Sequence, residues 1–117
     1  MEELKKMAAD CGFAYAEKHE LMEKKPLLGL AVCCIVADGY QCGFEFDGTK
    51  EELKAQSAEK ALDYVKERDA EIMQKAPLLG IALAIAYRYG LEKGIEAREG
   101  FEIEHDEHGN IVGIANK

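Results

Sequence analysis

The chain has 117 residues, of which 48% are hydrophobic and 32% charged, and its formal net charge is −8. This length supports one domain, and the apolar fraction is too high for a disordered tail. The excess of acid argues against a general binder of nucleic acid or anionic membranes, because such proteins need a basic surface. We find no signal sequence and no membrane-spanning run, and therefore expect a cytoplasmic protein without membrane association.

The first predicted element is a helix that covers most of residues 4–24. Its apolar residues recur every three or four positions, which is the helical period. Pro26 disfavours a helical conformation in the residue before it, so we expect this helix to end there. The same segment contains Cys11, the first of four cysteines. The other three are Cys33, Cys34 and Cys42, and none of the four forms a C-x-x-C pair, so we expect reduced thiols.

Residues 31–46 predict two strands joined by a turn. The run VCCIV at 32–36 is rich in strand formers. Asp38 and Gly39 follow it, and Asp-Gly is the strongest short hairpin signal. Residues 40–46 then return as the second strand.

A second helix is predicted over residues 50–75. Asp47 and Gly48 form a turn before it, and the Thr49 to Glu52 spacing is a capping box with Thr49 as N-cap. Pro77 sets its end, as Pro26 does for the first helix.

Residues 78–89 can be read in two ways. The segment suits an alanine-rich buried helix, but large residues at 81, 83, 85, 87 and 89 alternate with smaller ones or Arg88, which is the strand period. We assign a strand because this segment aligns with the strands predicted at 31–46.

That alignment rests on an internal repeat. The run MEKKPLLGLA at 22–31 matches MQKAPLLGIA 51 residues later, at 73–82. At the same offset Gly39 meets Gly90, and Gly43 meets Gly94. We therefore predict a single domain over 1–117, with repeat one at about 2–46, repeat two at about 51–97 and a tail at 98–117. In the tail, strands at 101–105 and 111–114 flank a turn.

The predicted fold is of the α+β class, a duplicated α-β-β unit (α-β-β-α-β-β) with a C-terminal strand or hairpin. Helices would cover one face of its antiparallel sheet. The other face would carry small residues, for which we expect a homodimer contact. Those residues are Ala31, Cys33, Ile35, Ala82, Ala84 and Ala86.

Residues 31–65 resemble the second half of a double-stranded-RNA-binding domain, in which two strands lead through a glycine-containing loop into a helix that starts with lysines. The matching residues are Asp38, Gly39, Gly43, Gly48, Thr49, Lys50, Lys54, Ala55, Ala58, Ala61 and Leu62. The resemblance implies phosphate contacts from Lys50 and Lys54. Acids and bases nearly balance along 50–75, which argues against duplex binding, so RNA is an alternative partner and not the first expectation.

No pattern of residues predicts a catalytic set, a cofactor or a metal site. His105 and His108 lie in a segment read as a strand running into a solvated turn, where a spacing of three does not bring side chains together. No phosphate-binding loop or dinucleotide fingerprint is present. A third alternative is a small-ligand sensor or enzyme with its site between sheet and helices or at a dimer seam, with Tyr87 and Tyr89 as an aromatic wall.

Acidic residues are concentrated near the C-terminus, and they carry the leading functional hypothesis. We predict an acidic rim that engages a basic protein surface, in a non-enzymatic inhibitor or regulator. Phage-borne inhibitors of host defence provide the analogy. The predicted rim residues are Glu92, Glu96, Glu99, Glu102, Glu104, Asp106 and Glu107.

Overall fold

Helices dominate the computed structural model, which describes residues 2–116. In chain order its elements are α1 (Glu2–Lys18), α2 (Leu21–Lys24), α3 (Pro26–Phe44), α4 (Lys50–Arg68), α5 (Ile72–Lys75), α6 (Pro77–Arg98), β1 (Phe101–His105) and β2 (Ile111–Asn116). Each predicted repeat therefore contains a long helix, a one-turn helix and a second long helix.

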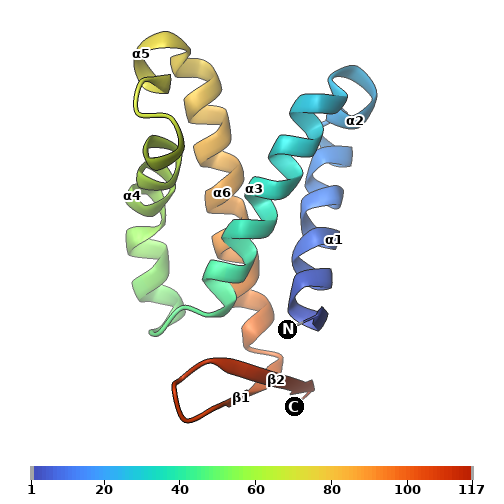
Figure 1. Ribbon diagram of the computed structural model, residues 1–117, viewed down its shortest axis with the longest axis vertical. Helices are drawn as coiled ribbons and strands as arrows, with labels where there is room; N and C mark the ends of the chain where they lie inside the picture. Colours follow the sequence, from blue (N-terminus) through green and yellow to red (C-terminus); the bar gives the residue numbers. More distant parts are fainter. Residues whose placement is uncertain (1, 117) are drawn as a thin grey trace.

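The two central helices, α3 and α6, cross each other in the middle of the molecule (Figure 1). Helix α1 packs on α3, and α4 packs on α6. The one-turn helices α2 and α5 lie at one end of the molecule, and the β-hairpin lies at the other, beside the two chain ends. The hairpin directly follows the end of α6 and packs against the apolar residues of α1 and α3 at this end of the molecule.

Four glycines allow α3 and α6 to approach each other closely. A Cβ atom at any of them would overlap a backbone carbonyl oxygen of the opposite helix, so any larger residue would push the helices apart. The contacts are reciprocal: each maps onto another at the repeat offset of 51 residues, which gives the crossing a local two-fold symmetry. They are Gly39 with Tyr87, Gly90 with Val36, Gly43 with Leu91, and Gly94 with Tyr40.

The predicted α-β-β-α-β-β fold is wrong, because residues 31–46 and 78–89 are helical. Asp38 and Gly39 lie within α3, where the glycine serves the helix crossing and not a hairpin turn. In α6 the alternation of large and small residues does not separate an inside from an outside. Among the small residues Ala84 and Ala86 are buried but Ala82 is exposed. Among the large ones Ile81 and Ile85 are exposed but Tyr87 is buried. The buried positions recur at helical spacing instead.

The sequence signals at the helix ends are confirmed in part. Each helix predicted to run up to a proline is interrupted, after Lys18 in the first repeat and after Arg68 in the second. Thr49 is the N-cap of α4, and its hydroxyl accepts a hydrogen bond of 3.1 Å from the backbone N–H of Glu52, which confirms the cap. Pro26 and Pro77 stop the preceding one-turn helices and occupy the first turns of α3 and α6, where their missing N–H groups cost nothing.

The C-terminal hairpin confirms the two strands predicted in the tail. Strands β1 and β2 pair antiparallel, with Ile103 opposite Ile114 and a register shift between Glu104 and His105. Phe101 and Ile103 pack against a core cluster that contains Leu4. The hairpin is therefore attached to the helices by one apolar face, and its other face is open to solvent.

The small-residue face predicted for a homodimer does not exist as a single surface. Cys33, Ala84 and Ala86 are buried within one chain, whereas Ala31 and Ala82 are exposed. A homodimer stays a prediction, but its expected contact face is corrected.

Helix α3 is long and apolar enough, by length and composition alone, to cross a membrane. It is the single such helix among residues 2–116, and 44% of its most apolar window is buried inside the molecule. Core helices pass the same test, and α3 packs here against both α1 and α6.

Candidate functional site

The predicted acidic rim is divided between α6 and the hairpin. On α6, Glu92 lies 3.5 Å from the Nε of Arg88, and Glu96 lies 3.7 Å from the Nζ of Lys93. Both pairs are one helical turn apart and partly exposed. These two acids are therefore already paired with bases on their own helix.

The hairpin acids are more available. Phe101 and Ile103 of β1 face the helices, so Glu102 and Glu104, at alternate positions, lie on the opposite and exposed face. Glu99 is also exposed, just before the strand. In the described part of the chain, none of these three carboxylates has an ion-pair partner.

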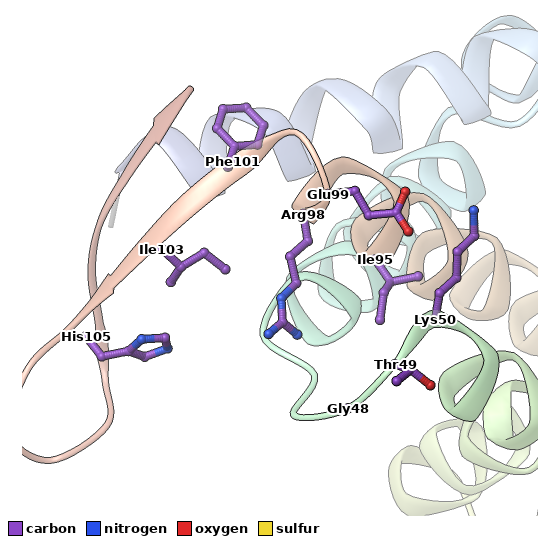
Figure 2. Close-up of a pocket in the computed structure, with 9 residues that line it drawn as sticks. All are labelled: Gly48, Thr49, Lys50, Ile95, Arg98, Glu99, Phe101, Ile103 and His105. Atoms are coloured by element: carbon purple, nitrogen blue, oxygen red, sulfur yellow. The ribbon is translucent and has the colours of Figure 1, made fainter. Parts of the chain in front are cut away.

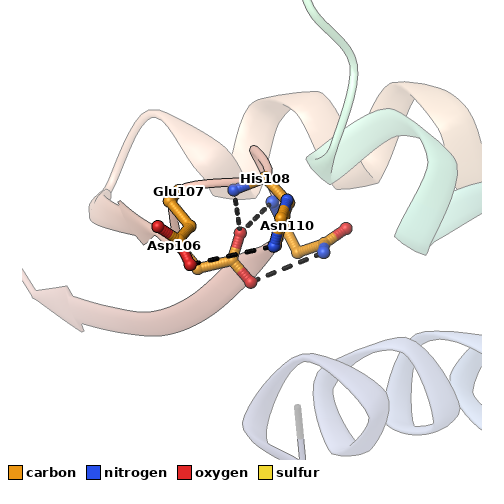
Figure 3. Close-up of polar contacts among 4 residues, drawn as sticks. All are labelled: Asp106, Glu107, His108 and Asn110. Carbon is orange, nitrogen blue, oxygen red and sulfur yellow. Dashed lines mark hydrogen bonds and ion pairs between the residues drawn. The ribbon is translucent and has the colours of Figure 1, made fainter.

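Asp106 organises the hairpin turn (Figure 3). Its Oδ1 accepts hydrogen bonds of 2.9 Å from the backbone N–H groups of both His108 and Asn110. Its Oδ2 accepts a longer one, of 3.4 Å, from the Asn110 side chain. The Asn110 backbone N–H contributes most to holding the pKa of Asp106 below its ordinary value. The Asp106 carboxylate is therefore bound within the turn. Glu107 is the other residue of the predicted rim that lies in this turn.

A cavity beside the hairpin lies between β1, the loop before α4 and the end of α6 (Figure 2). We call it the hairpin cavity; its volume is about 480 Å³. Lys50, Arg98 and His105 line it with basic groups. An Arg98 nitrogen donates a hydrogen bond to the carbonyl oxygen of Phe46, which holds the guanidinium between the loop and the strand.

A second polar site lies where α3, α4 and α6 meet. Tyr64 donates a hydrogen bond of 2.5 Å from its hydroxyl to Oδ2 of Asp38. The Arg68 guanidinium lies over the Tyr64 ring, 3.5 Å from its centroid, and 3.7 Å from the same carboxylate oxygen. The Tyr87 ring stacks on the opposite face of the Tyr64 ring, and the centroids of the two rings are 3.9 Å apart. We call these four residues the tyrosine cluster.

Burial is the largest cause that raises the pKa of Tyr64 well above its ordinary value, and the hydrogen bond to Asp38 adds to it. Burial also raises the pKa of Tyr87, with a further contribution from its hydrogen bond with Cys42. Both phenols therefore stay protonated at neutral pH. They can donate hydrogen bonds, but they are poorly suited to act as general bases.

The predicted aromatic wall of Tyr87 and Tyr89 is not formed. Tyr87 stacks on Tyr64 of α4, whereas Tyr89 packs on Tyr15 of α1 at a centroid distance of 4.8 Å. Because α1 and α4 lie on opposite sides of the central crossing, Tyr87 and Tyr89 lie on different sides of the molecule (Figure 1). Sequence reasoning missed Asp38 and Arg68 as partners of Tyr64. The aligned repeats held a signal, since Tyr64 matches Tyr15 but Arg68 stands where the other copy has His19.

The two lysines of the RNA alternative both lie in the first turns of α4. Lys50 lines the hairpin cavity, and Lys54 is exposed one turn later. The strands that the resemblance implied before this helix are replaced by α3. Duplex RNA as a partner stays a prediction.

Residues 2–116 contain no group of three or more His, Cys, Asp or Glu side chains that could hold a metal ion. All four cysteines are free; Cys33 is buried and Cys34 exposed. Burial raises the pKa of the Cys33 thiol, which makes it less reactive.

No protein-family model, curated protein or solved structure matches this chain. Its function is therefore argued from its own surfaces and cavities.

Proposed function

We propose that this protein is a non-enzymatic, cytoplasmic binding protein whose acidic hairpin engages a basic surface of another protein, as an inhibitor or regulator. One observation carries the proposal: Glu102 and Glu104 project together from a strand that is fixed to the core by its other face. Glu107 lies in the turn of the same hairpin, and Glu99 lies at the end of α6 just before the strand.

The attachment of the hairpin supports this role. Apolar residues Phe101, Ile103 and Ile114 pack against the helical core, so the outward carboxylates are presented from an ordered strand. Ordered charges of one sign attract an oppositely charged partner over a distance and speed its association. Val112 is 56% exposed on β2 and adds an apolar contact beside the acids.

The tyrosine cluster also supports a binding role over a catalytic one. Its two phenols stay protonated, and the Asp38 carboxylate is already shared by Tyr64 and Arg68. Neither arrangement leaves an activated nucleophile or a poised base.

A charge-reversal experiment tests the proposal. The double variant Glu102→Lys/Glu104→Lys is compared with Glu51→Lys/Glu59→Lys, which changes the net charge equally on the exposed face of α4. Each protein is titrated with an oligolysine peptide at low and at high salt, and each is used to capture partners from lysate. We expect the hairpin variant to lose peptide binding and partner capture, and the α4 variant to retain most of both.

Two results would contradict the proposal. The first is binding that is indifferent to salt, because attraction between exposed charges is screened. The second is an equal loss in both double variants, which would mean that net charge matters and the hairpin does not.

A further inference from the structure

We propose that the hairpin cavity binds a small organic anion, an apolar body that carries a carboxylate or a phosphate. This goes beyond the acidic surface of the hairpin, because the cavity lies on the inner side of β1, whereas Glu102 and Glu104 lie on its outer side. The two sites can therefore be tested separately.

The basic groups of the cavity come from three separate elements. Lys50 belongs to α4, Arg98 ends α6, and His105 ends β1. The chain carries 23 acidic residues, yet Glu99 is the single acid among the described residues that line this cavity. A locally basic cavity in an acidic protein favours an anionic ligand.

The donors of this cavity are not used up by the protein. Figure 2 shows the Arg98 and His105 side chains directed into the space between β1 and the loop at Gly48, with Lys50 at its rim. Within residues 2–116, neither Lys50 nor Arg98 forms an ion pair. Arg98 uses one nitrogen on the Phe46 carbonyl, which positions the guanidinium and leaves its other N–H groups for a ligand.

The remaining walls explain why the ligand is organic. Phe101 and Ile103, both half-buried, line the same cavity with apolar surface, to which Ile95 adds little because it is 3% exposed. A volume of about 480 Å³ is far larger than an inorganic ion needs and falls in the range of small-molecule sites. An anion without an apolar body would leave these side chains in contact with water, so the body contributes to affinity.

Calorimetric titration with defined probes tests the chemistry. Phenyl phosphate and benzoate carry the proposed anion on an apolar ring, inorganic phosphate lacks the ring, and benzylamine has the ring but the opposite charge. We expect at least one of the ring-bearing anions to bind about tenfold more tightly than either comparator. The preferred one of the two identifies phosphate or carboxylate as the recognised group. Equal affinity for benzylamine, or no binding of either anion, would overturn the proposal.

Two pairs of variants locate the site. His105→Glu adds a negative charge inside the cavity, and His108→Glu adds one on the exposed turn. Lys50→Glu reverses a charge at the cavity rim, and Lys54→Glu reverses one a turn further along α4. We expect about tenfold weaker binding of the tighter probe for His105→Glu and Lys50→Glu, and less than about threefold for the controls.

The Lys50 and Lys54 variants keep the test valid if His105→Glu fails to fold. Glutamate is favoured in the first turn of a helix, so Lys50→Glu should fold even if the strand variant does not. Equal loss within both pairs would place the anion elsewhere on the protein. Oligolysine binding is unaffected by failure here, which separates this test from that of the acidic hairpin.

Discussion

The two sides of the central crossing share the same glycine contacts and differ in the side chains around them. On one side, Tyr64 of α4 meets Asp38 and Arg68. On the other, the equivalent Tyr15 of α1 packs between His19 and Tyr89, at centroid distances of 4.4 and 4.8 Å. The glycine contacts between α3 and α6 are the same in both directions. Backbone approach is thus the shared property of the repeats, and the side chains around it are free to differ.

The glycine crossing gives the largest expected effect. Gly94→Ala places a methyl group on the Tyr40 carbonyl, and Gly43→Ala makes the reciprocal overlap with Leu91. Backbone atoms cannot rotate away, so we expect each variant to lose about 2 kcal/mol or more of unfolding free energy, despite the better helix propensity of alanine. Urea denaturation measures this loss.

Gly80→Ala is the matched control on α6. Its methyl group would meet the Sδ atom of Met73, the end of a flexible side chain. We expect it to be neutral or to stabilise the protein by up to about 1 kcal/mol. Equal destabilisation by Gly80→Ala and Gly94→Ala would disprove the close crossing.

The hydroxyl groups of the two equivalent tyrosines should contribute unequally. Tyr64→Phe removes the hydrogen bond to Asp38, which is half exposed, so we expect a loss of about 1 kcal/mol. Tyr15→Phe should change stability by less than about 0.3 kcal/mol, because its hydroxyl makes no hydrogen bond with the described residues. Chemical denaturation of both variants measures the difference. Equal effects would mean that the two sides are alike after all.

Folding stability at alkaline pH should also depend more on Tyr64 than on Tyr15. Because the folded pKa of Tyr64 is raised, its contribution to stability is fully present below the ordinary tyrosine value of 10 and is lost as the pH rises above it. We expect the midpoint of denaturation to fall above pH 10 in the wild type. The fall should be reduced more by Tyr64→Phe than by Tyr15→Phe. A fall that neither variant changes would assign it to other groups.

The turns before α2 and α5 give the smallest expected difference. Glu20 has a left-handed backbone with φ of 57°, whereas the equivalent Glu71 is right-handed with φ of −98°. Glu20→Gly removes this strain and should lie within about 0.5 kcal/mol of the wild type. Glu71→Gly gains nothing from its backbone and should lose about 1 kcal/mol. Thermal unfolding of the two variants checks the order, and the reverse order would contradict the difference in backbone.

Local signals predicted some elements well. The Thr49 cap, the helices that precede the two prolines and the C-terminal hairpin all depend on short-range chemistry that a sequence displays. The two central helices were mistaken for strands because their contact is made by glycine and alanine. Standard patterns expect large apolar residues inside, and here Ile81 and Ile85 are outside.

The candidate sites likewise include features that local sequence patterns predict and features that they do not. The outward acids of β1 follow from strand alternation once the strand is known. The hairpin cavity joins Lys50, Arg98 and His105 across more than 50 residues of sequence, and the tyrosine cluster joins Asp38 to Tyr64. No local pattern indicates that such residues meet, because the crossing of α3 and α6 and the docking of the hairpin bring them together.

The reciprocal crossing also means that the two halves of the chain bind each other through similar backbone contacts. One repeat makes the same contacts with the other repeat whether the two belong to one chain or to two different molecules. If the segment at 45–49 opens, two molecules can exchange halves and rebuild every contact of the crossing twice. We therefore predict that the segment at 45–49, which links the repeats, controls whether the protein stays a monomer or forms a domain-swapped dimer.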